Sequence, residues 1–136
     1  MNAQRDTEAI LLVDDEPSVL KAIGQLLKVR GYKVFEANSA EAAALVWSEH
    51  APEIDLLLAD VTMPGISGLE LANNLRVQDA GLKVILMSGY MLADLEARFN
   101  LPYSYNLLEK PFSPQILLKM VGKGLKEAQE LNHPTV

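Results

Sequence analysis

Short apolar runs alternate along the chain with longer stretches in which hydrophobic residues recur every three or four positions. The five short runs, rich in Val, Ile and Leu, are residues 10–13, 33–37, 54–59, 83–87 and 105–108. Such runs are typical of β-strands, and their alternation with helical stretches predicts parallel strands joined by crossover helices. The first, third and fourth runs are nearly all apolar, as expected of central strands, whereas the mixed second and fifth suit positions nearer the edges.

Helix-starting and helix-ending residues punctuate the stretches between these runs. Pro17 suits the first turn of a helix, where its missing N–H costs nothing, and Gly31 ends that helix. Ser39 is expected to cap a second helix that runs through Trp47, and Gly68 to open a third. The apolar positions that the first and third helices should bury are Val19, Leu20, Ile23, Leu26, Leu27, Leu69, Leu71, Ala72 and Leu75.

Two further helices are expected in the last third of the chain. One lies around residues 92–99, and Ser113 followed by Pro114 starts the other. The apolar face predicted for the last helix consists of Ile116, Leu117, Met120, Val121 and Leu125. We assign residues 9–131 to one domain, with an N-terminal extension over 1–8 and a tail over 132–136.

Five strand–helix units in succession predict a (βα)5 arrangement. Right-handed crossovers make this a doubly wound α/β fold of the flavodoxin-like class, a five-stranded parallel sheet with helices on both faces. In that architecture ligands bind outside the carboxyl ends of the strands. The residues that directly follow each apolar run are therefore the candidates for function.

The amino-acid composition excludes several kinds of functional site. The 12 Lys and Arg against 18 Asp and Glu give a net charge of −6, the wrong sign for a nucleic-acid-binding protein. The absence of cysteine excludes a disulfide framework, a thiol nucleophile and a cysteine zinc site. No apolar stretch approaches the roughly 20 residues that span a bilayer. We expect a cytoplasmic protein of a single domain, without nucleic-acid binding or membrane insertion and with oxygen-based site chemistry.

Polar residues follow four of the apolar runs. Asp14 and Asp15 follow the first, Asp60 the third, Ser88 the fourth and Lys110 the fifth. In a parallel sheet these positions converge at one edge. Two carboxylates about 4 Å apart repel by roughly 4 kcal/mol at an effective dielectric near 20. Either their pKa values rise or a divalent cation offsets the repulsion, and hard oxygen ligands at a water-accessible edge suit Mg²⁺.

Asp60 is the nucleophile we predict. A carboxylate flanked by a metal ion and a lysine can attack a phosphorus centre and form an acyl phosphate, because the cations stabilise the spreading negative charge. Ser88, followed by Gly89 with no side chain to block approach, is placed to hydrogen-bond a phosphoryl oxygen.

Four pieces of the sequence together resemble the receiver (CheY-like) domains of two-component response regulators. They are Leu-Leu-Val-Asp-Asp-Glu-Pro over 11–17, Asp-Val-Thr-Met-Pro-Gly-Ile-Ser-Gly over 60–68, Ser88-Gly89 and Lys-Pro-Phe over 110–112. Each piece is weak alone, but the four in this order and spacing are highly specific. The resemblance covers residues 10 to about 131. The pieces at 88–90 and 110–112 are similar to receivers attached to hybrid histidine kinases.

The resemblance implies strand order 2-1-3-4-5 and a phosphoryl transfer to Asp60 from a phosphohistidine, carried by a sensor histidine kinase or a histidine phosphotransfer protein. It implies that Lys110 and Ser88 contact the phosphoryl group, and that the Lys110-Pro111 peptide is cis, which only X-Pro bonds reach cheaply. The implied Mg²⁺ ligands are Asp15, Asp60 and the backbone carbonyl of Thr62, with Asp14 assisting.

One position departs from the family pattern. Receivers usually carry Tyr or Phe three residues before the lysine, where this chain has Leu107. In the family that ring couples the site to the surface formed by the fourth helix, fifth strand and last helix, where a downstream protein binds. Tyr105 and Tyr90 lie close in sequence and are candidates to replace it. A backbone shift of the loop after Ser88 is the alternative route, and we expect the coupling to survive. Tyr90 is also expected to shield the acyl phosphate from water.

Two other functions share parts of this pattern. A haloacid-dehalogenase-type phosphatase also combines an Asp nucleophile, a Ser or Thr, a Lys and Mg²⁺, but its usual second aspartate is Thr62 here, and 136 residues leave little space for a cap domain. A docking module that retains the fold without phosphorylation is the third reading. Our leading hypothesis is a phosphorylation-driven switch of partner affinity, without multiple-turnover catalysis.

Overall fold

The computed structural model describes residues 7–89 and 105–132. Within these ranges one sheet has the strand order β2-β1-β3-β4-β5, and every neighbouring pair is parallel. The strands are β1 (Ala9–Val13), β2 (Lys33–Ala37), β3 (Ile54–Asp60), β4 (Lys83–Ser88) and β5 (Asn106–Glu109). The predicted doubly wound fold is confirmed, and the two mixed runs form the edge strands.

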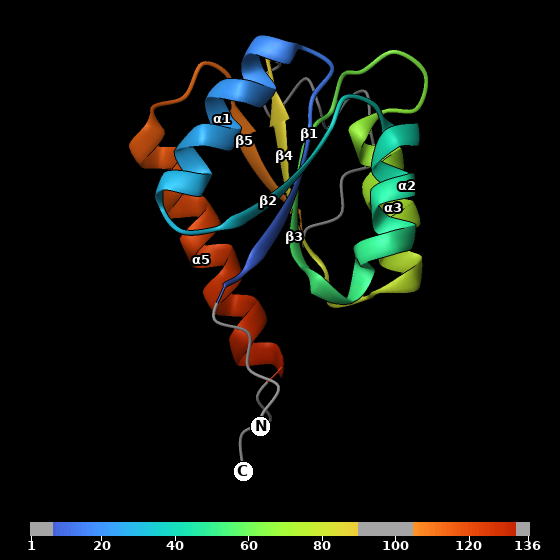
Figure 1. Cartoon of the computed structure of the whole chain (residues 1–136), viewed down its shortest axis with the longest axis vertical. Coiled ribbons are helices and arrows are strands. Elements are labelled where there is room, and N and C mark those ends of the chain that lie inside the picture. Colours follow the sequence, from blue (N-terminus) through green and yellow to red (C-terminus); the bar gives the residue numbers. More distant parts are fainter. Residues whose placement is uncertain (1–6, 90–104, 133–136) are drawn as a thin grey trace.

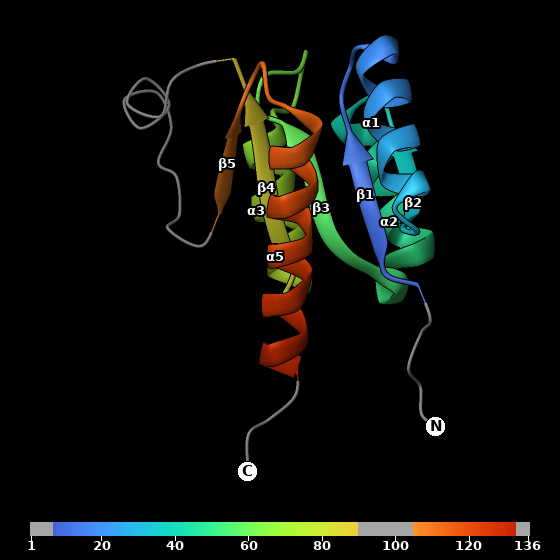
Figure 2. The ribbon, with the colours of Figure 1, turned by 90° about the vertical axis from the view of Figure 1, so that its left-hand side faces the viewer.

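Helices cover both faces of the sheet. Figure 1 shows the strands between α1 and α5 on one side and α2 and α3 on the other, and Figure 2 shows the α5 side face-on. The helices are α1 (Pro17–Val29), α2 (Ala40–His50), α3 (Gly68–Gln78) and α5 (Pro114–Asn132), with a 3-10 helix η1 (Ala51–Glu53) after α2. Among the described residues no helix has the length and apolar character needed to cross a membrane.

The element ends differ from the predictions in small ways. The second helix extends three residues past Trp47 and continues into η1, and β5 begins at Asn106 rather than at Tyr105. Pro52, the second residue of η1, has no N–H to donate and so suits the first turn of a tight 3-10 helix. Apolar periodicity does not reveal so short an element. The helix expected around 92–99, Tyr90 and the terminal residues 1–6 and 133–136 lie outside the described residues.

The core consists of two apolar layers, one on each face of the sheet. In β1, Leu11 and Val13 pack with α2 and α3, while Ile10 and Leu12 pack with α1 and α5. Successive strand side chains point to opposite faces, so a central strand must be apolar at every position. The order of the sheet therefore explains the uninterrupted apolar runs at β1, β3 and β4.

The prediction for one residue of the last helix, Ile116, is wrong. Ile116 is 52% exposed, whereas Leu117, Val121 and Leu125 are buried. These three residues are four positions apart and define the face of α5 that meets the sheet. Ile116 precedes that face by one residue, about 100° around the helix, and so points to its flank.

Candidate functional site

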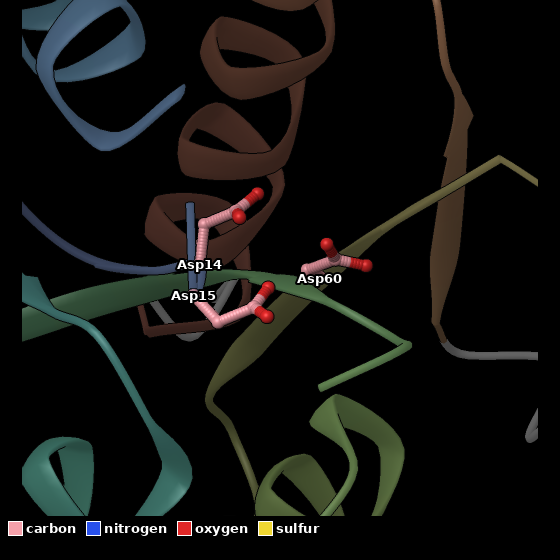
Figure 3. Close-up of side chains that lie close together, drawn as sticks. All are labelled: Asp14, Asp15 and Asp60. Atoms are coloured by element: carbon pink, nitrogen blue, oxygen red, sulfur yellow. The ribbon is translucent and has the colours of Figure 1, made fainter. Parts of the chain in front are cut away.

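Three carboxylates meet at the carboxyl edge of the sheet. Asp14 and Asp15 directly follow β1, and Asp60 is the last residue of β3, the neighbouring strand. Figure 3 shows them gathered at the ends of these strands, and one oxygen from each lies within 4.8 Å of the others. Asp14 and Asp60 are buried, whereas Asp15 is exposed to solvent. The group therefore offers oxygen ligands to a cation that arrives from water.

The end of β3 sets the orientation of Asp60. The ladder with β4 continues one residue past the strand, because the Val61 N–H donates to the Met87 carbonyl at 2.9 Å. The chain then turns, and the Thr62 N–H donates to Asp60 Oδ1 at 3.0 Å. The carboxylate is thus held by the turn that follows it.

Helix α3 begins directly against the backbone of Asp60. The Gly68 N–H donates to the Val61 carbonyl at 3.0 Å, and a Cβ on Gly68 would collide with the Asp60 carbonyl. Only glycine allows this approach of helix to strand. Ser67 caps the helix by accepting from the Glu70 N–H at 3.1 Å. Our sequence analysis missed this cap, although the Ser-x-x-Glu spacing is its usual signal.

Asp14 is fully buried and has a structural partner for each oxygen. Its Oδ1 accepts from the Glu16 N–H at 2.9 Å, at the start of α1, and its Oδ2 accepts from Lys110 Nζ at 3.1 Å. Its own N–H donates to the Ala37 carbonyl at the end of β2 at 3.2 Å. These bonds connect Asp14 to β2, α1 and the lysine at once.

Lys110 joins the two buried carboxylates. Its Nζ donates to Asp60 Oδ2 at 3.0 Å as well as to Asp14. Its backbone N–H donates to the Ser88 carbonyl at 2.7 Å, so the ends of β4 and β5 are tied together. The Lys110-Pro111 peptide is cis, as the resemblance implied. Ser88 is buried, at 2% exposure, at the same edge of the sheet.

Burial and charge act on the site in opposite directions. Burial raises the pKa of Asp60, and the hydrogen bonds from Lys110 and Thr62 only partly offset this. Burial lowers the pKa of Lys110, but its hydrogen bonds to Asp60 and Asp14 outweigh burial and leave the pKa raised. With three carboxylates and one ammonium the site has excess negative charge, which favours a divalent cation with hard oxygen ligands.

The remaining predicted residues lie at different distances from this cluster. Thr62 is exposed in the turn after Asp60, so its carbonyl belongs to the same edge. Leu107 is half-buried and packs in the apolar layer beneath α2 and α3. Tyr105 is buried in that layer, and its hydroxyl donates to Asn73 of α3 at 2.7 Å. The sequence carries no signal for this last pairing, because the two residues are 32 positions apart.

Comparison with known proteins identifies relatives of this arrangement. The family model described as the response regulator receiver domain matches residues 10–122. The C4-dicarboxylate transport transcriptional regulatory protein DctD of Pseudomonas aeruginosa is 35% identical over 117 residues, 86% of this chain and 25% of that protein. The sensor kinase CckA of Brucella abortus is 38% identical over 123 residues, 89% of this chain and 12% of that protein.

A solved structure agrees with these sequence matches. The crystal structure of the receiver domain from the hybrid histidine kinase CckA superimposes with a TM-score of 0.74 at 35% identity, covering 86% of this chain and 98% of that one. The chain thus spans a quarter or less of the two longer curated relatives but nearly the whole of an isolated receiver.

Proposed function

The chain belongs to the response regulator receiver domain family of two-component systems, and from this premise we propose that Asp60 accepts a phosphoryl group from a phosphohistidine. The observation that carries the proposal is the ammonium of Lys110, shared between buried Asp14 and Asp60 with Asp15 beside them. The donor is a sensor histidine kinase or a histidine phosphotransfer protein. We assign this function to residues 9–131 and place the protein in the cytoplasm, which the lack of cysteine favours.

The proposed step is a transfer between two nucleophiles. An Asp60 carboxylate oxygen attacks the phosphorus and the phosphorus–nitrogen bond of the donor breaks. The donor leaves as a neutral imidazole, which keeps the proton on its other ring nitrogen. Lys110 neutralises the charge that develops on the phosphoryl oxygens. Ser88, at the end of the neighbouring strand, hydrogen-bonds one of those oxygens.

The donor set fits Mg²⁺, because the three carboxylates offer oxygens that lie within 4.8 Å of one another. Asp15, Asp60 and the carbonyl of Thr62 would hold the ion, with Asp14 assisting. Bound there, it supplies charge neutralisation and orients the phosphoryl group. Exposed Asp15 is where the ion enters, and buried Asp14 keeps Lys110 in place.

A groove beside the site suits the protein that delivers the phosphoryl group. It has a volume of about 480 Å³ and connects α1 with the segment that follows β5. Its lining residues are Ser18, Val19, Ala22, Ile23, Lys110, Pro111 and Phe112. Because Lys110 belongs to both the groove and the carboxylate cluster, a helix packed on α1 brings its histidine side chain to Asp60.

Acetyl phosphate labelling in the presence of Mg²⁺ tests the proposal. We expect one phosphoryl group per chain, and borohydride reduction followed by peptide mass spectrometry should find homoserine at position 60. Asp60→Asn should abolish the label, whereas Asp79→Asn should keep it, because Asp79 lies at the opposite end of α3. A label that persists in Asp60→Asn contradicts the proposal.

The number of substrate molecules turned over distinguishes the phosphatase hypothesis from the phosphorylation-driven switch. With p-nitrophenyl phosphate and Mg²⁺, a phosphorylation-driven switch should release little nitrophenolate beyond one equivalent. Sustained release of many equivalents would instead support a haloacid-dehalogenase-type enzyme. A docking module that ignores phosphorylation would show neither the label nor turnover.

A further inference from the structure

Contacts that pass through α3 and β5 form a closed ring, which begins and ends at Asp60. On one side Gly68, the first residue of α3, lies against the Asp60 carbonyl. On the other side Lys110, directly after β5, donates to the Asp60 carboxylate. The ring closes between α3 and the residue before β5, where the Tyr105 hydroxyl donates to Asn73 Oδ1 at 2.7 Å.

The contact between Tyr105 and Asn73 is specific. Tyr105 is 8% exposed, and the side chain of Arg76, one turn along α3, lies over its ring at 5.4 Å. The Tyr105 hydroxyl is the donor in this bond, and burial raises its pKa further above neutral pH. Asn73 itself is exposed on α3. One partner is thus fixed in the core and the other stands at the surface.

The other links of the ring are less able to give way. Gly68 is held by a backbone bond to Val61 and has no room beside Asp60, and Lys110 is held by a backbone bond to Ser88. Opening either of them would leave a buried main-chain group without a partner, which is costly. Opening the bond at Asn73 leaves the exposed Asn73 amide in water, which replaces its lost partner, so the cost falls on the Tyr105 hydroxyl alone.

Phosphorylation of Asp60 changes one link of this ring, the contact between Asp60 and Lys110. Lys110 Nζ lies 3.0 Å from Asp60 Oδ2, so a phosphoryl group on this carboxylate gives the ammonium new oxygens to contact in place of Oδ2. This change moves the Lys110 ammonium, which directly follows β5 in the chain, relative to α3. We propose that the Tyr105–Asn73 hydrogen bond is a latch that stabilises the unphosphorylated state and opens when Asp60 is phosphorylated. This inference rests on the proposed function and adds to it a regulatory pair of residues.

Beryllofluoride, an unreactive mimic of the phosphoryl group, tests the latch by titration with excess Mg²⁺ under NMR. If the latch opposes the switch, removing it should tighten beryllofluoride binding about fivefold, the factor that corresponds to one neutral hydrogen bond. Tyr105→Phe removes only the hydroxyl and keeps the ring beneath Arg76. Asn73→Ala removes the acceptor at an exposed helical position, where alanine supports folding.

The double variant isolates the bond from other effects. Tyr105→Phe combined with Asn73→Ala should bind beryllofluoride no more tightly than either single variant, because both remove the same interaction. Tyr32→Phe, which removes a phenol in the apolar layer beneath α1 and α5, and Asn74→Ala, on the neighbouring exposed asparagine, are the matched controls and should match the wild type.

Two results would overturn the latch: changes below twofold in both single variants, or single effects that add in the double variant. Failure of the proposed function looks different, because wild-type protein would then bind no beryllofluoride, or would bind it equally well in Asp60→Asn. A direct readout accompanies the titration. The side-chain amide signals of Asn73 should shift on saturation of wild-type protein with beryllofluoride and stay unchanged in Tyr105→Phe.

Discussion

Asp14 and Asp15 are neighbours in the chain, yet only Asp14 is buried. The difference follows from hydrogen bonding, since Asp14 has a backbone donor and a lysine for its oxygens while Asp15 faces water. Asp60 resembles Asp14 in being buried, at 7% exposure, and in accepting hydrogen bonds from Lys110 and Thr62. Its pKa is nevertheless raised, because burial outweighs these hydrogen bonds. Burial therefore disfavours the ionised form of Asp60 in the metal-free protein, and a bound cation would offset this effect.

Replacing Asp60 by asparagine should stabilise the metal-free protein. The amide keeps the shape but removes one of three negative charges around a single lysine, so we expect a gain on the order of 1 kcal/mol in the free energy of unfolding at pH 7.5. Urea denaturation in the presence of a chelator measures it. Asp79→Asn serves as the control. A loss of stability in Asp60→Asn would show that the charge of Asp60 does not destabilise the metal-free protein.

The pH dependence of that gain has a definite sign. Because the pKa of Asp60 is raised by burial, the folded state keeps its proton while the unfolded state has lost it, and wild-type stability falls as pH rises through that window. Asp60→Asn lacks this fall. Its advantage should be absent below the ordinary pKa of aspartate and complete above the raised one, as urea titrations at a series of pH values would record.

At the level of elements, the site depends on how closely α3 approaches β3. The helix begins at Gly68, capped by Ser67, and its first residue touches the backbone that carries the proposed phosphoacceptor. The turn between them also supplies the Thr62 N–H. The position of one helix thus sets the orientation of the reactive carboxylate.

Gly68→Ala should damage both the fold and the site. The added methyl meets the Asp60 carbonyl, so α3 must move away, at a cost of about 2 kcal/mol in unfolding free energy. Acetyl phosphate labelling should slow as well, because the turn that holds Asp60 is displaced. Gly81→Ala is the matched control, since its new methyl meets Asp79 Oδ1 at an ordinary 3.6 Å. Equal behaviour of the two variants would show that the approach is not tight.

For the whole molecule, the carboxylate cluster links cation binding to global stability. A ligand that binds only the folded state stabilises it by about 2.7 kcal/mol at one hundred times its dissociation constant. We expect Mg²⁺ at such a concentration to raise the unfolding free energy accordingly. In Asp15→Asn the metal-free stability should change little, because Asp15 is exposed, while the increase with Mg²⁺ should largely disappear. An undiminished increase would place the ion elsewhere.

The groove between α1 and the segment after β5 predicts a second property of the whole molecule. Ala22 lines this groove and is exposed, so Ala22→Arg fills it without disturbing the core. Transfer from a phosphorylated histidine phosphotransfer protein should slow at least about tenfold, since a misplaced donor loses its oriented approach. Labelling by acetyl phosphate, which needs no docking, should be unchanged. Parallel loss of both reactions would indicate damage to the site itself.

The sequence by itself determined the strands, their central or edge positions and the residues that follow them. Burial on two faces makes a strand uniformly apolar, and parallel strands bring their carboxyl ends to one edge, so Asp14, Asp15, Asp60 and Lys110 could be placed together before any coordinates. The strands and their central or edge positions can be predicted from short stretches of sequence, because they depend on the spacing of apolar residues. The family resemblance added the strand order and the cis peptide.

Only the tertiary structure decided which of those groups are buried and what each one contacts. The sharing of Lys110 between Asp14 and Asp60, the approach of Gly68 to the Asp60 carbonyl, and the exposure of Ile116 depend on how helices are placed on the sheet. The pairing of Tyr105 with Asn73 depends on it too. Periodicity shows which face of an element turns inward, but the partner it meets there is set by the relative positions of elements distant in the chain.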